Sequence, residues 1–213
     1  MANKGITDQE LAAQLRKPTG ELGKLVAEKM SQNNAFLYQQ AFQLMDIQPT
    51  DRVLEIGFGH GQFLAQTVEL ASDGWVAGVD FSEDMILAAS YRYATLIEAG
   101  KLAIVQGDIT AIPYADNTFT KVFALNTIYF IDDPLGALQE LYRVLRTGGM
   151  GCIGIRTAST MKNHAFTQYG FTCYELPQVE ELFLQAGFKA IQHKHQSDEV
   201  SPEFDALTVI GFK

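Results

Sequence analysis

A short apolar run with an acidic residue near its end, followed by three glycines at alternate positions, constrains this chain more than any other feature. The run is Val53 to Ile56, with Glu55 within it, and the glycines are Gly57, Gly59 and Gly61. β-Branched and aliphatic residues in a run of this length are typical of a buried strand. Glycine has no Cβ atom, so a turn built from it lets the backbone approach a ligand closely. The stretch therefore predicts a strand that ends at a ligand site.

Strand-like and helix-like segments alternate along the rest of the chain. The apolar spacing predicts strands at 53–56, 75–80, 102–105, 121–125 and 150–155, with helices at 63–73, 82–100 and 135–145. Such alternation predicts a parallel sheet with helices on both faces, in which ligands bind beyond the carboxyl ends of the strands. A helix at 178–186 precedes two strands, 188–196 and 206–212, which a short loop joins as an antiparallel hairpin. We expect an α/β, Rossmann-like doubly wound fold with a mostly parallel seven-stranded sheet and this C-terminal hairpin.

The first 48 residues carry a weaker pattern. Residues 1–19 lack strong periodicity, so we expect a mobile or loosely docked arm. Between 21 and 44 apolar residues recur at helical spacing, interrupted by the polar residues 31–34, which predicts two short helices. We therefore divide the chain into an N-terminal arm with helices, 1–48, and a sheet domain, 49–213.

Composition limits the classes to which the chain can belong. Its 213 residues, 47% of them hydrophobic, suit one α/β domain with an appendage. The formal net charge of -9 would repel a polyphosphate backbone, so we expect no nucleic-acid partner. Cys152 and Cys173 lack the spacing of a disulfide framework or zinc site, and we expect no metal. The polar N-terminus is unlike a signal peptide, and no apolar run reaches about 18 residues, which predicts a cytoplasmic protein without a membrane span.

The spacing of the glycines discriminates between the ligands that glycine-rich loops bind. A dinucleotide-binding loop has the form G-x-G-x-x-G, and here the third glycine comes too early. A phosphate-binding P-loop would continue with Gly-Lys-Ser or Gly-Lys-Thr, which the chain does not have. A nicotinamide-dependent oxidoreductase and a P-loop protein are both disfavoured.

The loop instead resembles the first motif of the class I S-adenosylmethionine-dependent methyltransferases, E/D-x-G-x-G-x-G. Four further segments are similar to later motifs of that family, in order: Gly78-Val79-Asp80-Phe81-Ser82, Gln106-Gly107-Asp108-Ile109, Ala124-Leu125-Asn126-Thr127-Ile128-Tyr129 and Glu140-Leu141-Tyr142-Arg143-Val144-Leu145-Arg146-Thr147-Gly148-Gly149. The resemblance covers about 51–155 and resumes at the terminal hairpin, in the style of the ubiquinone/menaquinone-biosynthesis branch. It implies methyl transfer from S-adenosylmethionine to a small-molecule acceptor.

The resemblance also implies a set of residues for the cofactor. They are Glu55, Gly57, Phe58, Gly59, Gly61, Asp80, Phe81, Met85, Asp108, Ile109 and Asn126. Glu55 would accept a hydrogen bond near the ammonium group, directly or through water, with capping of the turn as the alternative. Asp80 would hold both ribose hydroxyls, and its alternative role as an N-cap is disfavoured because Ser82 suits that task.

The other members of the set surround the base and the methyl group in the resembled family. Phe81 and Met85 would cover one face of the adenine, although helical spacing alone would also bury Met85. Asp108 would accept from the adenine amino group with Ile109 beside the ring, and a turn-forming aspartate is the alternative. Asn126 would face the methionine end and the methyl group.

Methyl transfer from a sulfonium is an in-line displacement, so alignment of the acceptor and exclusion of water matter most. Only some acceptors need a general base. The candidates lie between the fifth strand and the next helix: His164, Tyr169 and Tyr174. His164 is the best of them by its ordinary pKa of about 6.5, and an exposed loop histidine is its alternative. His60, inside the glycine loop, is a weaker candidate, whereas His193 and His195 alternate on a strand and are expected on its solvated face.

The resembled branch often folds the segment before the first strand over the cofactor as a helical lid. Residues placed to contribute to it are Leu22, Gly23, Lys24, Met30, Asn34 and Tyr38. Aromatic residues are also dense around the expected pocket: Phe58, Tyr129, Phe130, Phe166, Tyr169, Phe171 and Tyr174. This density favours an apolar or aromatic small acceptor over a polyanion, and ordinary packing is the alternative. A binding or regulatory protein that keeps the fold without turnover is the second hypothesis for the function.

Overall fold

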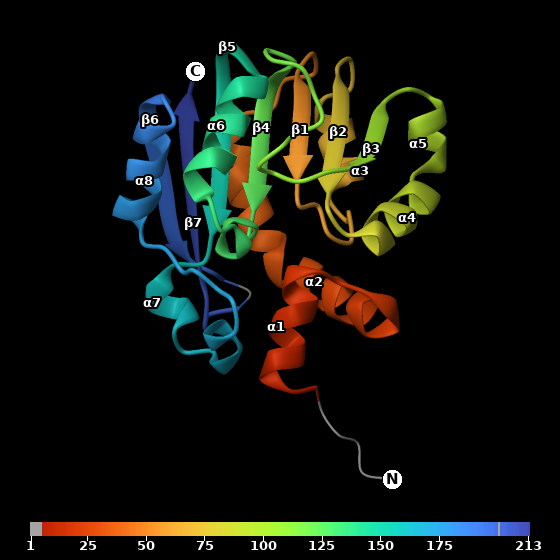
Figure 1. The fold of residues 1–213 in the computed structure, drawn as a ribbon. Coiled ribbons are helices and arrows are strands. Elements are labelled where there is room, and N and C mark those ends of the chain that lie inside the picture. The colour runs from red at the N-terminus through yellow and green to blue at the C-terminus, as the bar shows by residue number, and fades with distance from the viewer. Residues whose placement is uncertain (1–5, 200) are drawn as a thin grey trace.

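The computed structural model describes residues 6–199 and 201–213, which form one seven-stranded sheet with flanking helices (Figure 1). The strands are β1 (Arg52–Ile56), β2 (Trp75–Asp80), β3 (Leu102–Gln106), β4 (Phe119–Leu125), β5 (Leu145–Ile155), β6 (Lys189–Ser197) and β7 (Asp205–Phe212). They lie in the order β3-β2-β1-β4-β5-β7-β6. The first five run parallel, and β7 runs antiparallel to both β5 and β6. The expected mostly parallel sheet with a C-terminal antiparallel hairpin is confirmed.

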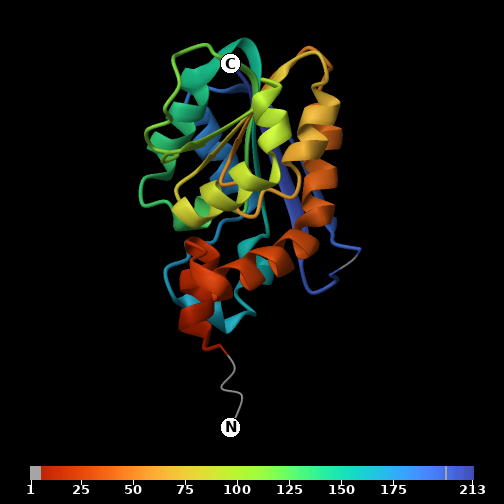
Figure 2. The same cartoon turned by 90° about the vertical axis from the view of Figure 1, so that its right-hand side faces the viewer.

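Helices cover both faces of this sheet, as the view turned by 90° shows (Figure 2). They are α1 (Asp8–Arg16), α2 (Gly20–Met45), α3 (Leu64–Leu70), α4 (Glu83–Arg92), α5 (Ala94–Glu98), α6 (Pro134–Val144), α7 (Ala158–Met161) and α8 (Leu176–Gln185), with the 3-10 turns η1 (Ile128–Phe130) and η2 (Ala165–Gln168). One buried cluster joins the sheet to α6 and α8, and another joins it to α2, α3 and α4. Among the described residues, no helix is long and apolar enough to cross a membrane.

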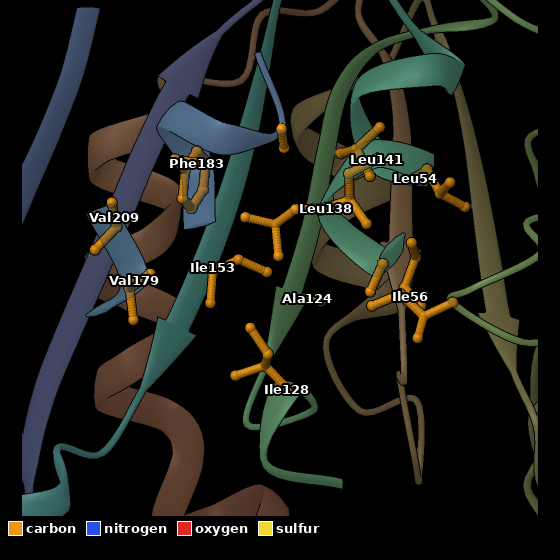
Figure 3. Close-up of a cluster of buried hydrophobic side chains, with 14 of the residues drawn as sticks. Leu54, Ile56, Ala124, Ile128, Leu138, Leu141, Ile153, Val179, Phe183 and Val209 are labelled. Atoms are coloured by element: carbon orange, nitrogen blue, oxygen red, sulfur yellow. The ribbon is translucent and has the colours of Figure 1, made fainter. Parts of the chain in front are cut away.

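Strand β1 is buried on both faces, and its side chains alternate between the two clusters. Leu54 and Ile56 pack in the cluster with α6, where Figure 3 shows them near Leu138 and Leu141. Val53 belongs to the cluster on the side of α2. Glu55 follows Val53 at a spacing of two residues and is 1% exposed. A carboxylate is therefore buried between β1 and α2.

The N-terminal region differs from the prediction. One continuous helix of 26 residues, α2, runs through the polar stretch 31–34, where the sequence predicts a break between two helices. Two side chains of this stretch have partners, one within α2 and one across the site: Ser31 Oγ donates to the Ala27 carbonyl, and Asn34 Oδ1 accepts from Asn126. The described part of the expected loose arm also contains a helix, α1, which a capping box between Thr7 and Glu10 stabilises. Residues 1–5, part of the polar N-terminus used against a signal peptide, lie outside the described residues.

Two boundaries in the sheet domain also differ from the prediction. The single helix expected at 82–100 is divided into α4 and α5 at Tyr93, whose hydroxyl donates to the Gly61 carbonyl at 2.7 Å. Strand β5 begins at Leu145, earlier than residue 150, because Leu145 already pairs with Phe119 of β4. The first difference matters for the site, since Tyr93 ties the helix pair to the glycine loop.

Candidate functional site

The glycine loop follows β1 at the point where the order of strands reverses. The chain proceeds from β1 to β2 and β3 on one side and returns to β4 on the other, so the carboxyl ends of β1 and β4 border a crevice. Gly57, Gly59 and Gly61 have φ values of 72°, 54° and 70°, a region that residues with a Cβ atom adopt only at a cost. The N–H of Gly57 donates to the Val79 carbonyl at 2.7 Å, which holds the loop against β2.

Two adjoining cavities open beside this loop, with volumes of about 310 Å³ and 150 Å³. Gly57, Gly59 and Asn126 line both of them. The smaller cavity lies at the ends of β2 and β3, and the larger one lies between the loop, the lid helices and the segment around η2. Figure 1 shows α1 and the first half of α2 across the carboxyl ends of the parallel strands. The roof of the site is therefore made of the N-terminal helices.

Asp80 is the polar group most tightly fixed at the smaller cavity. Its side chain is 5% exposed, with Oδ2 accepting from the Gly59 N–H at 2.8 Å and Oδ1 accepting from the Ser82 N–H at 2.9 Å. Burial raises the pKa of the Asp80 carboxyl, and the two N–H groups oppose that rise. Ser82 is the N-cap residue of α4, as predicted, but its side chain makes no capping hydrogen bond, because its hydroxyl donates instead to the Pro18 carbonyl. Asp80 thus organises the loop as well as facing the cavity.

The other residues predicted for the adenosine end divide into two groups. Phe81, Asp108 and Ile109 line the smaller cavity. Met85 is 1% exposed and lies in the core cluster under α4, so the structure favours its packing role. Asp108 lines the cavity and also forms a turn, because its Oδ1 accepts from both the N–H and the hydroxyl of Thr110. Phe58, for its part, is 4% exposed and lines the larger cavity.

Asn126 stands between the two cavities in a connected set of polar groups. It has a φ of 53°, which is uncommon for a residue other than glycine. Its Nδ2 donates to Asn34 Oδ1 of α2 at 2.8 Å, and its Oδ1 accepts from the Tyr129 hydroxyl at 3.1 Å. The lid helix and the end of β4 are therefore joined directly at the site.

Arg156 is a buried cation at the larger cavity and is not among the residues predicted for the site. It follows β5 and is 4% exposed. Its guanidinium donates to the Asn33 carbonyl at 2.7 Å and to the Asp205 carbonyl, and it pairs with Asp198 at 2.7 Å. The available signal was a single arginine at the end of an otherwise apolar strand. Its bonds join α2, β5 and β7 behind the cavity.

Only some of the residues predicted for the helical lid line the larger cavity. Met30, Asn34 and Tyr38 line the larger cavity, whereas Leu22, Gly23 and Lys24 are not among its lining residues. Lys24 instead pairs with Glu21 on the exposed side of α2. Aromatic side chains form much of the remaining wall: Phe58, Phe63, Tyr129, Phe130, Phe166, Phe171 and Phe204. Phe63 and Phe204 were not among the predicted residues.

Glu55 and Tyr38 form a buried pair between β1 and α2. The Tyr38 hydroxyl donates to Glu55 Oε1 at 2.6 Å, and Glu55 Oε2 is buried without a partner among the described residues. Burial raises the pKa of Glu55 to about 7, the bond from Tyr38 opposes the rise, and Asp80 adds to it. Burial likewise raises the pKa of Tyr38 well above its usual value, so Tyr38 is the donor of the pair.

His60 lines the larger cavity and contacts Arg92 of α4. The Arg92 guanidinium lies 3.1 Å from His60 Nδ1. Burial lowers the pKa of His60, Arg92 lowers it further and Glu28 opposes the shift. An arginine can only donate, so Nδ1 accepts and the proton of the neutral ring lies on Nε2. His60 in this arrangement offers a hydrogen-bond donor rather than a base.

The candidate bases predicted between β5 and α8 are not brought to the cavities. His164 stacks between Phe166 and Phe204, with ring centroids 5.4 Å and 4.6 Å away, behind rings that line the larger cavity. Tyr174 is 6% exposed in the core cluster, and burial raises its pKa. Tyr169 is 46% exposed. Other side chains of this segment, Phe166 and Phe171, line the larger cavity instead.

The two histidines of β6 are largely exposed, as predicted for a solvated face. His193 lies 3.1 Å from Glu180, and His195 lies 2.7 Å from Asp205. In the described part of the chain, no three His, Cys, Asp or Glu side chains are grouped so that they could hold a metal ion. Both histidines are accounted for by these carboxylate contacts.

Residues 54–153 of this chain match a protein family that is described as "Methyltransferase domain". YrhH of Bacillus subtilis (strain 168), which is named as a methyltransferase, is 34% identical over 124 residues, covering 58% of this chain and 68% of that protein. This chain belongs to the methyltransferase family. The demethylmenaquinone methyltransferase of Bacillus mycoides (strain KBAB4) is 30% identical over 112 residues, which cover 52% of this chain and 47% of that protein. The present chain therefore matches only about half of that relative.

A solved structure has a similar fold over nearly the whole length of this chain. It is phosphoethanolamine N-methyltransferase 2 of Haemonchus contortus, in complex with phosphomonomethylethanolamine and S-adenosylhomocysteine. The TM-score is 0.73 at 17% identity, with 98% of this chain and 61% of that chain covered. The methyltransferase is an S-adenosylmethionine-dependent enzyme by family, and the predicted cofactor is confirmed.

Two glycines of the loop form a matched pair for a prediction. A Cβ atom at Gly57 would lie 2.4 Å from Thr127 Oγ1, whereas one at Gly59 meets nothing within 4 Å. Both φ values are positive, which costs each alanine variant about 1 to 2 kcal/mol. We expect Gly57→Ala to lose more stability than Gly59→Ala in thermal unfolding, because Thr127 must move.

The same pair separates stability from binding. The space beside Gly59 belongs to both cavities, so its new methyl group would occupy volume that a ligand needs. We expect Gly59→Ala to weaken S-adenosylhomocysteine binding about tenfold or more by calorimetry. Wild-type affinity in Gly59→Ala would show that the ligand does not approach this part of the loop.

Proposed function

We propose that the methyltransferase transfers a methyl group from S-adenosylmethionine to a compact apolar or aromatic small molecule by in-line displacement. The observation that carries this proposal is the pair of adjoining cavities at the glycine loop. The adenosine half of the cofactor would fill the smaller cavity. Its methionine half would pass Gly57 and Gly59 into the larger cavity and meet the acceptor there. Methyl transfer requires the donor and the acceptor to lie side by side, and two cavities that share a wall provide this.

In this proposal each wall of the smaller cavity has a role. The Asp80 oxygens, which already accept from backbone N–H groups, would use their remaining lone pairs for the ribose hydroxyls. Phe81 and Ile109 would pack against the adenine, and Asp108 would accept from its amino group. Met85 would support this wall from the core. Asn126 would lie beside the sulfonium, between donor and acceptor.

The larger cavity supports the acceptor class. Rings and methionines form much of its surface, and its buried cation, Arg156, is already paired with Asp198. A polyanion would find the charge of Arg156 already paired, whereas an apolar ring would replace water at the aromatic side chains. We assign residues 1–48 to a lid and 49–213 to the methyltransferase domain, since α1 and α2 supply the roof of this cavity.

The chemistry proposed for the protein is alignment without a strong base. The amide of Asn126 is bonded to Asn34 and Tyr129, and burial raises the pKa of the Tyr129 hydroxyl. His164 and Tyr174 would act as bases only after movement of the segment between β5 and α8. An acceptor whose nucleophilic atom reaches the cavity unprotonated is therefore favoured, because displacement at a sulfonium then needs only orientation and exclusion of water.

Calorimetry and a labelling experiment test this function. We expect saturable binding of S-adenosylhomocysteine and transfer of label from methyl-labelled S-adenosylmethionine to a component of an apolar small-molecule extract. Absence of S-adenosylhomocysteine binding would overturn the proposed cofactor site. Binding without a labelled product would favour the second hypothesis, a binding or regulatory protein that keeps the fold.

A further inference from the structure

Asn34 of α2 has an amide group of which only the oxygen is used within the protein. The residue is partly buried and lines the larger cavity but not the smaller one. Its Oδ1 accepts from Asn126 Nδ2 at 2.8 Å, and no hydrogen bond among the described residues uses its Nδ2 group. Nδ2 is not one of the inaccessible polar atoms that lack a partner, so a ligand can reach it.

The orientation of this amide is set by the hydrogen bonds behind it. The Arg156 N–H donates to the Tyr129 oxygen, and burial raises the pKa of Tyr129, so the hydroxyl keeps its hydrogen and donates it. Two oxygens receive that hydrogen bond, the Arg156 carbonyl at 3.0 Å and Asn126 Oδ1 at 3.1 Å. With its oxygen turned to Tyr129, Asn126 turns its Nδ2 to Asn34, whose oxygen accepts. Asn34 therefore offers the cavity a nitrogen that can only donate.

Asn34 lies on the side of the site that is away from the adenosine end. Its partner Asn126 follows β4, and the carbonyl of the preceding residue, Asn33, accepts from Arg156 after β5 at 2.7 Å. In the sheet, β1 separates β4 and β5 from β2 and β3, at whose ends the smaller cavity opens. The free donor of Asn34 is therefore placed for the ligand that occupies the larger cavity.

The aromatic wall of the larger cavity makes this donor selective. Phe130, Phe166 and Phe171 are among its lining residues. In the free protein, water in the cavity can accept from the Asn34 N–H group. A ligand without a polar atom would displace that water and leave the donor unpaired, whereas a carbonyl oxygen would replace the bond. An ammonium group would place one donor against another.

We propose that Asn34 donates a hydrogen bond to a carbonyl oxygen of the methyl acceptor, which narrows the acceptor class to apolar or aromatic carbonyl compounds. The proposal rests on the proposed function, since it places the acceptor in the larger cavity. Asn126, which is bonded to Asn34, would lie beside the sulfonium. A bond at the carbonyl oxygen would therefore hold the neighbouring atoms of the acceptor close to the methyl group.

Two probes of nearly the same shape test the proposal. Acetophenone has a carbonyl oxygen where α-methylstyrene has a methylene group. Their affinities are measured by NMR titration of the protein saturated with S-adenosylhomocysteine. We expect the wild type to bind acetophenone about tenfold or more tightly than α-methylstyrene, because only the ketone pairs the buried donor.

Three variants assign this preference to one nitrogen. Asn34→Leu removes the amide, and Asn34→Asp keeps an oxygen for Asn126 but replaces the donor by an atom that cannot donate. Both should reduce the preference for acetophenone to about twofold or less. Gln39→Leu changes an exposed amide on the same helix, and it should keep the preference of the wild type.

The outcomes separate this proposal from the proposed function. Calorimetry should show S-adenosylhomocysteine bound by both Asn34 variants within about threefold of the wild type, and a larger loss in both would mean that Asn34 serves the cofactor. That result overturns the proposal, as do a wild type that binds neither probe or both equally, and a preference that survives in the variants. If Asn34→Leu does not fold, Asn34→Asp decides. Failure of the wild type to bind S-adenosylhomocysteine would instead count against the proposed function.

Discussion

Replacing Asp80 with alanine is expected to weaken S-adenosylhomocysteine binding about 100-fold or more while the protein stays folded. Two effects act together in this variant. The ribose would lose a charged acceptor, and hydrogen bonds to charged groups contribute about 1.5 to 3 kcal/mol each. The loop would also lose its anchor, because Asp80 Oδ2 accepts from the Gly59 N–H and Oδ1 from the Ser82 N–H.

Calorimetry with folded protein measures this effect, and circular dichroism checks the fold. Glu83→Ala is the matched control, since Glu83 is an exposed carboxylate three residues further along the chain at the start of α4. The Glu83→Ala variant should bind S-adenosylhomocysteine with the affinity of the wild type. An Asp80→Ala variant that bound within about threefold of the wild type would contradict the ribose assignment, because that change is under 1 kcal/mol.

The largest loss of stability is expected from Phe123→Ala. Phe123 lies in β4, is 0% exposed, and meets Tyr38 and Phe42 of α2 edge-on at 6.3 Å and 6.0 Å. Removal of a fully buried phenylalanine costs about 3 to 5 kcal/mol, through lost burial and the cavity left behind. Because domains are stable by only about 5 to 15 kcal/mol, the variant should be close to unfolding at physiological temperature.

Chemical denaturation gives the change in the free energy of unfolding. In thermal unfolding, the midpoint temperature of Phe123→Ala should be roughly 10 °C below that of the wild type. Tyr91→Ala removes an aromatic ring that is 90% exposed on α4, and its effect should lie within about 0.5 kcal/mol. A loss of less than 1 kcal/mol in Phe123→Ala would show that α2 is not held on the sheet by this aromatic group.

The elements that could be predicted from sequence are those whose signal is local. Neighbouring residues alone indicate a strand end or turn at Val53 to Ile56, at the glycines after it and at Asp80. The structure brings these segments to one edge of the sheet. The alternation of strands and helices likewise needs only local periodicity. The carboxyl ends of these strands then lie at one edge of the sheet because the strands run parallel.

The contacts that could not be predicted join distant parts of the chain. Arg156 bonds to Asn33, 123 residues earlier, and Asn126 bonds to Asn34, 92 residues earlier. Periodicity gives no distance between such pairs. The same contacts explain the wrong prediction for α2, because a polar stretch that finds partners across the site reads in sequence like a break between helices. His164 and Tyr174 belong to a segment whose Phe166 and Phe171 line the larger cavity, but side-chain direction in a loop has no period from which to infer it.

The continuity of α2 has a consequence for how substrates exchange. Its first half roofs the cavities and its second half packs on the sheet, so bending it at the middle would break backbone hydrogen bonds and disturb the core. Movement costs least at the turn between α1 and α2, where the Gly20 N–H donates to Asp84 and the Pro18 carbonyl accepts from Ser82. These two bonds tie the turn to the start of α4, at the adenosine end. We therefore expect release of the spent cofactor and admission of the next acceptor to be linked, because Pro18 in this turn lines both cavities.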